Sequence, residues 1–386
     1  MDFAFTPQQD TFRREVLAFI QQEVTPDLVE ETSYRQDSGP LIRRFVKRMG
    51  AKGWLSMTWP KRFGGQERSS IERLILSDEL EYHGAPYGAI AERAVAPVLM
   101  HSASRDLQEE FLPRIAGGDI DFAIGYTEPE AGSDLASLKT RAVEDGDDFV
   151  VTGQKMFNSG CHWAEYHWLA VRTNDEAPKH KGISVLIVDL NTPGITVKPL
   201  WTMGGWRTNM VFYDNVRVPR RNLVGEQDRG FYHIAAALDL ERMQVTGSLR
   251  RHFDDFVAHV RADGVLRKLS PHEAALLRWK LAGHAIDIET CRLLSYRTAW
   301  LQSKGIVPNY EASQIKVFYK ETYQRFAHTC VHALGLFGQI QRGDRRAPLD
   351  GVFEHLIRGR VLGTIAGGSS EIQRNIIATR GLGLPR

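Results

Sequence analysis

The chain has 386 residues, of which 42% are hydrophobic and 25% are charged, so its composition excludes a disordered or fibrous protein. Lysine and arginine total 49 against 47 acidic residues, and a net charge of +2 gives no general electrostatic reason to expect nucleic-acid binding. At roughly 150 residues per domain, this length predicts two to three domains.

The sequence shows neither a membrane segment nor a cross-linking framework. No apolar run reaches about 18 residues, and the start Met1 to Phe5 lacks a basic stretch leading into an apolar one, so we expect a cytoplasmic protein without a membrane span. Cys161, Cys291 and Cys330 are widely spaced and form no Cys-x-x-Cys pair. We therefore expect buried thiols, and neither disulfides nor a metal site.

Helical patterns fill the first hundred or so residues. Thr6 is followed by Pro7 and by Gln9, which is typical of a helix start with a capping box. Apolar spacing predicts further helices over 41–52, 71–82 and 106–116, the last one stopping at the glycine pair that follows it.

Short apolar runs separated by Gly, Pro, Asn and Asp predict strands between about 119 and 228. The predicted strands cover 149–152, 168–173, 183–188 and 211–213, and helical patterns return from about Gly230. This order predicts an α+β chain with a helical domain (1–118), a β domain (119–228) and a second helical domain (229–386).

The usual cofactor and nucleophile motifs are missing. The sequence has no G-x-G-x-x-G, no P-loop, no G-x-S-x-G and no H-E-x-x-H. Any cofactor must therefore be bound by another arrangement.

One candidate cofactor segment is the loop 122–134, which is rich in hydroxyls and glycines. Its backbone N–H groups and the hydroxyls of Thr127 and Ser133 could hydrogen-bond a heterocycle or a phosphate. An ordinary polar turn is the alternative.

A second candidate is the segment 155–159. If it is extended, Phe157 and Ser159 share one face, so that Phe157 could cover a planar ring and Ser159 could donate to its edge. A core aromatic is the alternative.

Two helix ends complete the candidates. Glu241 and Arg242 stand near the start of a predicted helix, where a solvated helix face is the alternative. After Gly367 and Gly368, Ser370 could cap the next helix with Gln373 completing the box, and the free N–H groups would suit an oxyanion. A tight turn between helices is the alternative there.

Four motifs occur in a fixed order over about 250 residues. They are Tyr126-Thr127-Glu128-Pro129 with Gly132-Ser133-Asp134, Lys155-Met156-Phe157-Asn158-Ser159, Val216-Arg217-Val218-Pro219 with Asn222-Leu223-Val224-Gly225, and Gly368-Ser369-Ser370-Glu371-Ile372-Gln373-Arg374. In this order and spacing the chain resembles the acyl-CoA dehydrogenase family over almost its whole length.

The resemblance implies N-terminal helices, a central β-barrel-like domain and a C-terminal four-helix bundle, in agreement with the pattern of elements. It also implies FAD as the cofactor, an acyl-CoA substrate, a trans-2-enoyl-CoA product and an electron-transferring flavoprotein as the acceptor. By position, the residues implied to contact FAD are Tyr126, Thr127, Gly132, Ser133, Phe157, Ser159, Ser369 and Glu371. Ser133 is implied to contact the substrate as well.

The catalytic base departs from the commonest family pattern. Many members place a glutamate where this chain has Gly367, whereas a branch resembling isovaleryl-CoA and long-chain dehydrogenases supplies it from an earlier Leu-Glu-Arg segment. Asp239-Leu240-Glu241-Arg242 matches that segment. The resemblance therefore implies Glu241 as the base, the Gly367 N–H as a donor to the thioester carbonyl, and Arg242 as a contact near the CoA end.

Further departures concern contacts between subunits. The run 332–338 has fewer glycines than the family pattern, and 267–270 reads Arg-Lys-Leu-Ser in place of Arg-x-x-Phe. Both are similar to steroid-degrading members, so we expect a homotetramer or a heterotetramer with a related subunit. The alternative function is a non-catalytic subunit that completes a partner's FAD site. An oxidase stays open, and a DNA-associated member would carry an added basic domain.

Overall fold

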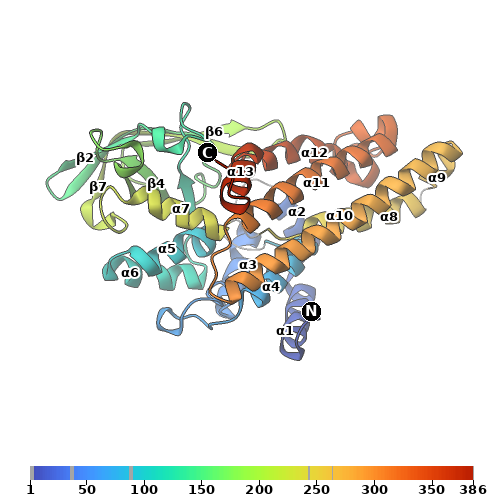
Figure 1. The fold of residues 1–386 in the computed structure, drawn as a ribbon, viewed down its shortest axis with the longest axis horizontal. Helices are drawn as coiled ribbons and strands as arrows, with labels where there is room; N and C mark the ends of the chain where they lie inside the picture. The colour runs from blue at the N-terminus through green and yellow to red at the C-terminus, as the bar shows by residue number, and fades with distance from the viewer. Residues whose placement is uncertain (1–3, 35–38, 87–89, 242–243, 263, 386) are drawn as a thin grey trace.

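The computed structural model describes residues 4–34, 39–86, 90–241, 244–262 and 264–385. Helices come first along the chain, a β-sheet follows, and helices return after it (Figure 1). The predicted α+β class and its helix, strand, helix order are confirmed.

The N-terminal part is helical. Its helices are α1 (Pro7–Glu23), α2 (Pro26–Tyr34), α3 (Pro40–Ala51), α4 (Ser70–Tyr82), α5 (Ala96–Ser102) and α6 (Arg105–Gly117). The capping box at Thr6 is confirmed, because the Thr6 hydroxyl accepts the Gln9 N–H while the Gln9 side chain accepts the Thr6 N–H. Helices α3, α4 and α6 begin and end within one residue of the predicted ranges.

The middle part is one seven-stranded sheet. Its strands are β1 (Phe122–Gly125), β2 (Arg141–Asp145), β3 (Asp148–Lys155), β4 (Tyr166–Arg172), β5 (Ile183–Asp189), β6 (Ile195–Trp201) and β7 (Arg207–Pro219). Hydrogen bonds order them β1-β4-β2-β3-β7-β6, with β5 paired to β4. The four predicted strands are present as β3, β4, β5 and β7, whereas β1, β2 and β6 were not predicted.

The C-terminal part is built around two long helices (Figure 1). Its α-helices are α7 (Gly230–Glu241), α8 (Gly247–Ala262), α9 (Val265–Lys268), α10 (Pro271–Ser303), α11 (Tyr310–Leu334), α12 (Val352–Gly359) and α13 (Ser370–Ile376). Buried aromatic rings of Phe256, Phe326 and Phe353 pack edge to face and join α8, α11 and α12.

Polar contacts tie the C-terminal helices to the rest of the molecule. On α4, the buried Asp78 carboxylate accepts the Thr246 N–H at 2.8 Å and forms an ion pair with Arg250. Between β6 and β7, the Met203 carbonyl accepts from the Arg358 guanidinium of α12 at 2.6 Å. These contacts fix α4 and the β6–β7 turn against the helices that enclose the pocket described below.

Two expectations from the sequence concern membranes and cysteines. In the part of the chain that the structure describes, no helix has both the length and the apolar character needed to cross a membrane. Cys161, Cys291 and Cys330 are buried and free, as predicted.

Candidate active site

The loop after β1 is attached to the end of β3 by a buried ion pair. The Lys155 ammonium, which is fully buried, donates to the Glu128 carboxylate at 2.8 Å and to the Tyr126 carbonyl at 3.2 Å. The Met156 N–H donates to the Thr127 carbonyl at 2.8 Å. Two of the sequence motifs are thereby joined into one surface that contains Thr127.

Burial disfavours the charged forms of Glu128 and Lys155, and the attraction between them offsets part of that effect. Burial alone would raise the pKa of Glu128, but the Lys155 ammonium and the N–H groups of Thr140 and Lys139 lower that pKa below its usual value. Burial lowers the pKa of Lys155 to about 8 although Glu128 raises it. The loop conformation therefore depends on both partners being present.

Phe157 stands beyond the end of β3 in a strained and exposed conformation. Its φ of +61° lies in the left-handed region, which bulky residues seldom adopt, and its side chain is 53% exposed. The strand ends at Lys155, so the prediction that Phe157 and Ser159 share a strand face is wrong. The segment is held instead by the buried Asn158, whose amide donates to the Ile124 carbonyl at 2.8 Å.

The surface beside this segment is open. Gly132 and Ser133 are exposed, and a Cβ built on Gly132 would meet no atom within 4 Å. Ser159 is exposed as well, with its hydroxyl 3.3 Å from that of Thr208. An exposed, strained aromatic with a serine hydroxyl two residues further along the chain fits the flat ring and polar edge of a flavin.

Tyr126 faces the other way. Its side chain is buried, and its hydroxyl accepts the Trp168 Nε1–H at 3.0 Å within the core. The side chain of Tyr126 is therefore not placed for the predicted cofactor contact. A contact through its main chain stays a prediction.

The glycine turn before α13 is capped one residue earlier than predicted. Ser369 is the N-cap, its hydroxyl accepting the Ile372 N–H at 3.4 Å, whereas Ser370 is buried, so the prediction of Ser370 as the cap is wrong. Gln373 donates to the Gly367 carbonyl at 3.3 Å instead of closing a capping box. Gly367 has a φ of +66° and Glu371 is exposed in the first turn of α13.

Glu241 is the last residue of α7, so the prediction that it stands near the start of a helix is wrong. Its side chain, like Arg242 as a whole, lies outside the described residues. Gln244 and Val245, three and four residues after Glu241, line the same pocket as Gly367. The backbone therefore brings the Glu241 segment and the Gly367 turn to one cavity.

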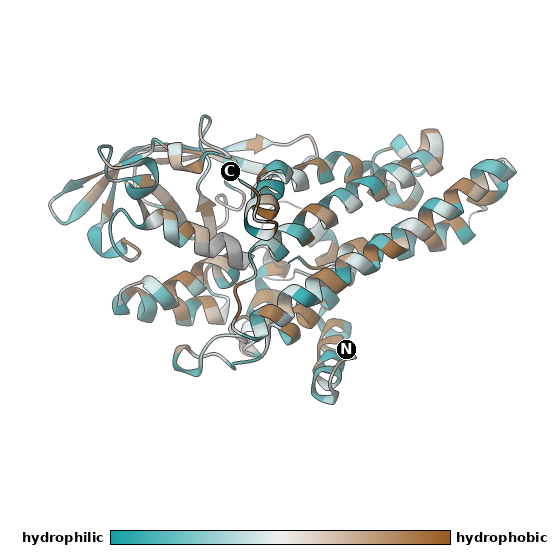
Figure 2. Ribbon diagram, in the orientation of Figure 1, coloured by the Kyte–Doolittle hydropathy of each residue, from teal (hydrophilic) through white to brown (hydrophobic). Residues whose placement is uncertain are grey.

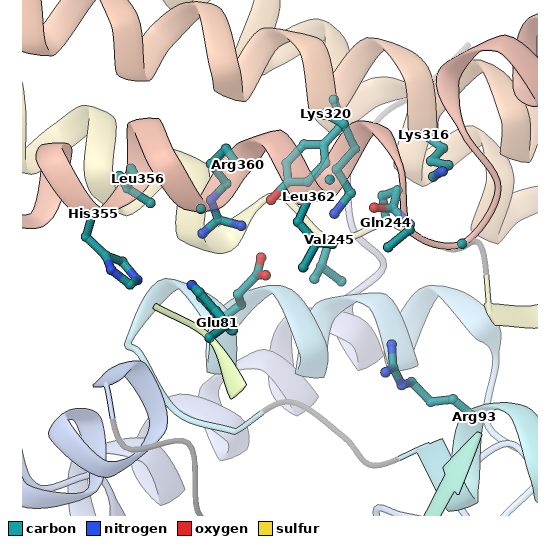
Figure 3. Close-up of a pocket in the computed structure, with 16 residues that line it drawn as sticks. Glu81, Arg93, Gln244, Val245, Lys316, Lys320, His355, Leu356, Arg360 and Leu362 are labelled. Atoms are coloured by element: carbon teal, nitrogen blue, oxygen red, sulfur yellow. The ribbon is translucent and has the colours of Figure 1, made fainter. Parts of the chain in front are cut away.

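This pocket has a volume of about 320 Å³ and lies between α4, α11 and the segment that joins α12 to α13. Charged side chains from these elements and from the helical turn Ala91–Val95 project into it (Figure 3). They are Glu81, Arg93, Lys316, Lys320 and Arg360. Sequence reasoning missed all five.

A signal for part of this set exists on α11. Buried positions Ala312, Ile315 and Tyr319 mark the inward stripe of the helix, and Lys316 lies within it. Lys320, one helical turn further, stands beside the same stripe. A lysine in an apolar stripe is unusual and indicates a polar partner or a ligand.

Comparison with known proteins identifies the fold. Residues 6–119, 123–216 and 228–382 match the N-terminal, middle and C-terminal domain models of acyl-CoA dehydrogenases. The chain belongs to the acyl-CoA dehydrogenase family. Members are FAD-dependent flavoproteins, so the chain is an oxidoreductase with FAD as its cofactor.

Three similar proteins match over the whole chain. Acyl-CoA dehydrogenase FadE26 of Mycobacterium tuberculosis is 38% identical over 100% of this chain and 99% of its own. The structure described as the Tcur3481-Tcur3483 steroid ACAD is 38% identical, covers 100% of both chains and has a TM-score of 0.92. The ChsE4-ChsE5 complex from Mycobacterium tuberculosis is 37% identical, covers 100% of both chains and has a TM-score of 0.89.

Proposed function

We propose that this acyl-CoA dehydrogenase converts an acyl-CoA thioester to the trans-2-enoyl-CoA, with Glu241 as the base that removes the α-proton. The observation that carries the proposal is the shared pocket, which is lined by Gly367 and by Gln244 and Val245, three and four residues after Glu241. A thioester carbonyl bound beside Gly367 would present its α-carbon to the end of α7.

The reaction requires both a base, Glu241, and a donor to the carbonyl oxygen, the Gly367 N–H. The α-proton of a thioester is weakly acidic, so the carbonyl oxygen must be polarised while the proton leaves, and the Gly367 N–H supplies that donor. A carboxylate removed from water is also a stronger base, and binding of the substrate in this pocket would remove Glu241 from water. When bound, FAD accepts the β-hydride.

The cofactor and the CoA moiety would be held by residues of the open surface and the glycine turn. Phe157 would cover one face of the flavin ring, and Ser159 and Thr127 would hydrogen-bond its edge. Gly132 and Ser133 leave space for the remainder of the cofactor, with Ser369 and Glu371 approaching from α13. Ser133 and Arg242 are proposed contacts of the substrate.

Replacing Glu241 with Gln tests the base. We expect Glu241→Gln to retain yellow, FAD-loaded protein and to lose about 10²- to 10⁴-fold in the rate of flavin bleaching by acyl-CoA, the range typical of a general base. Glu226→Gln, an exposed carboxylate that precedes α7, is the matched control and should bleach normally. Near-normal bleaching of Glu241→Gln would contradict the assignment.

We propose further that the chain assembles through α10. Large apolar side chains, Trp279, Ile286, Leu293 and Trp300, are exposed at every seventh residue along this 33-residue helix, and the two similar structures are named for complexes. Figure 2 shows hydrophobic residues recurring along the same ribbon. A stripe at heptad spacing suits a partner helix, from a second copy or from a related subunit.

A subunit that completes a partner's FAD site is the second candidate function. It is favoured by the short helix at Gly335–Gln339, where Leu336 is 83% and Phe337 is 55% exposed in the segment implied to meet a neighbouring flavin. Counting FAD per chain in the purified protein separates the two, since one bound FAD per chain that reduces with acyl-CoA excludes a purely supporting role. Reoxidation by an electron-transferring flavoprotein tests the proposed acceptor.

A further inference from the structure

The described residues that line the pocket beyond Gly367 carry more positive than negative charge. Among the charged lining residues that the structure describes, Arg93, Lys316, Lys320 and Arg360 are basic and Glu81 is the acidic one. In Figure 3 the head groups of Glu81, Lys320 and Arg360 point toward a common space, and Arg93 lies to one side of it, on the same lower wall as Glu81. A pocket for a plain hydrocarbon chain would be lined by apolar side chains.

Contacts with neighbouring residues hold the head groups of Arg360 and Glu81 in place. The Arg360 guanidinium lies 3.9 Å from the centroid of the Tyr323 ring and donates to its hydroxyl at 3.1 Å. The Tyr323 hydroxyl is buried and is also bonded to the His252 ring. The Glu81 carboxylate accepts the Ser248 N–H at 3.0 Å, at the N-terminus of α8. The charges are therefore positioned by the fold.

Lys320 is the group that points to a ligand. Within the described residues its ammonium makes no hydrogen bond or ion pair, and it lies 4.9 Å from the centroid of the Tyr319 ring. Burial, and then the nearby Arg360, lower the pKa of Lys320 to about 8 although Glu81 raises it. A cation that is desolvated and repelled by a second cation gains from an incoming anion.

We propose that this pocket selects acyl-CoA substrates whose acyl group carries a second carboxylate at its far end. The carboxylate pairs with Lys320 and Arg360, and the protonated form of Glu81 donates a hydrogen bond to it. The inference rests on the proposed function, because it places the thioester at Gly367 and the remote carboxylate among the charges beyond.

Two thioesters of equal chain length test the proposal. Octanoyl-CoA ends in a methyl group and suberyl-CoA ends in a carboxylate, so their kcat/KM ratio in flavin bleaching by the FAD-loaded enzyme measures the preference. We expect suberyl-CoA to be favoured in the wild type. Lys320→Met should reduce that preference by roughly 10- to 100-fold, the range for a buried hydrogen bond to a charged group.

Other variants separate charge from shape. Lys61→Met, at an exposed lysine outside the pocket, should leave the ratio unchanged. Lys320→Arg keeps the charge and should retain the preference. Glu81→Gln should retain or increase it, because the glutamine amide can still donate a hydrogen bond to the substrate carboxylate and can never carry a competing negative charge. If Lys320→Met does not fold, the wild-type ratio and Glu81→Gln still decide the question.

The outcomes distinguish this inference from the function on which it rests. Equal bleaching by both thioesters, or a preference for octanoyl-CoA, overturns the carboxylate proposal and leaves dehydrogenation standing. If neither thioester bleaches the flavin, the proposed function fails for these chains, and calorimetric binding is compared instead. Tighter binding of suberyl-CoA that is lost in Lys320→Met then supports the pocket assignment, and equal binding overturns it.

Discussion

Replacing Glu81 with Gln should stabilise the protein above neutral pH and leave it unchanged in acid. Burial, opposed in part by the Ser248 N–H and by Arg360 and Lys320, raises the pKa of Glu81 from 4.5 to about 7. The folded protein therefore retains this proton to a higher pH than the unfolded chain does. Between pH 4.5 and 7 the unfolded chain binds fewer protons, so the free energy of unfolding falls as the pH rises.

The size of the effect follows from that difference. At 1.36 kcal/mol per pH unit, a pKa that moves from 4.5 to about 7 corresponds to a penalty of about 3 kcal/mol, complete above pH 7 and absent below 4.5. Glutamine can still accept the Ser248 N–H but carries no charge. Glu81→Gln should therefore gain up to about 3 kcal/mol at pH 8, or roughly 5 °C in the unfolding midpoint.

Thermal unfolding followed by tryptophan fluorescence at pH 5 and pH 8 measures this difference. The exposed Glu226→Gln serves as the control and should show the same midpoint as the wild type at both pH values. The reasoning is refuted if Glu81→Gln changes the midpoint equally at both pH values, or if it lowers the midpoint at pH 8. An equal change would mean that Glu81 has the same charge at both pH values, whereas a lower midpoint at pH 8 would mean that neighbouring cations outweigh burial at this carboxylate.

Other changes test the remaining parts of the site. Lys155→Met leaves Glu128 buried without its partner, so it should lower the free energy of unfolding by about 3–5 kcal/mol and release FAD. Adding Glu128→Gln should recover part of the lost stability and part of the lost FAD, measured by unfolding and by flavin absorbance. Gly367→Ala places a Cβ at a φ of +66° and should lower kcat with FAD content unchanged, at about 1 kcal/mol of strain; an unchanged kcat would contradict the role of this N–H. Trp279→Lys with Trp300→Lys should shift the particle to a smaller assembly in light scattering, and an unchanged mass would show that α10 is not the interface.

The sequence predicted the elements whose hydrophobic pattern is strong. Strands β4 and β5 are buried over nearly their whole length and read as continuous apolar runs. Strands β2 and β6 are mostly exposed and have few buried positions. Their sequences therefore show neither a continuous nor a clear alternating apolar pattern. Strand β1 has 4 residues, too few for a period to be recognised.

The site was predictable where chemistry is local along the chain. The hydroxyl-rich loop and the glycine turn carry their own signals, because the residues that act together are neighbours in sequence. The charged pocket is different, since Glu81 on α4 and Arg360 before α13 meet only after three separate helices pack. In the sequence Glu81 lies within four residues of two other acids, Asp78 and Glu79, and nothing there shows which one faces α11.

The directions of the pKa changes of Glu81 and Lys320 indicate that the charged pocket lowers the stability of the protein. If Glu81 and Lys320 formed a close ion pair, the pKa of the carboxyl would fall and that of the amine would rise. Instead burial raises the first and lowers the second, so removal from water outweighs their attraction. Both charges then oppose folding in the absence of a ligand, which is the pattern of a binding site maintained at the expense of stability. It follows that Glu81→Gln combined with Lys320→Met should be more stable than the wild type near neutral pH and lose its preference for suberyl-CoA, whereas a structural ion pair would make the double variant less stable.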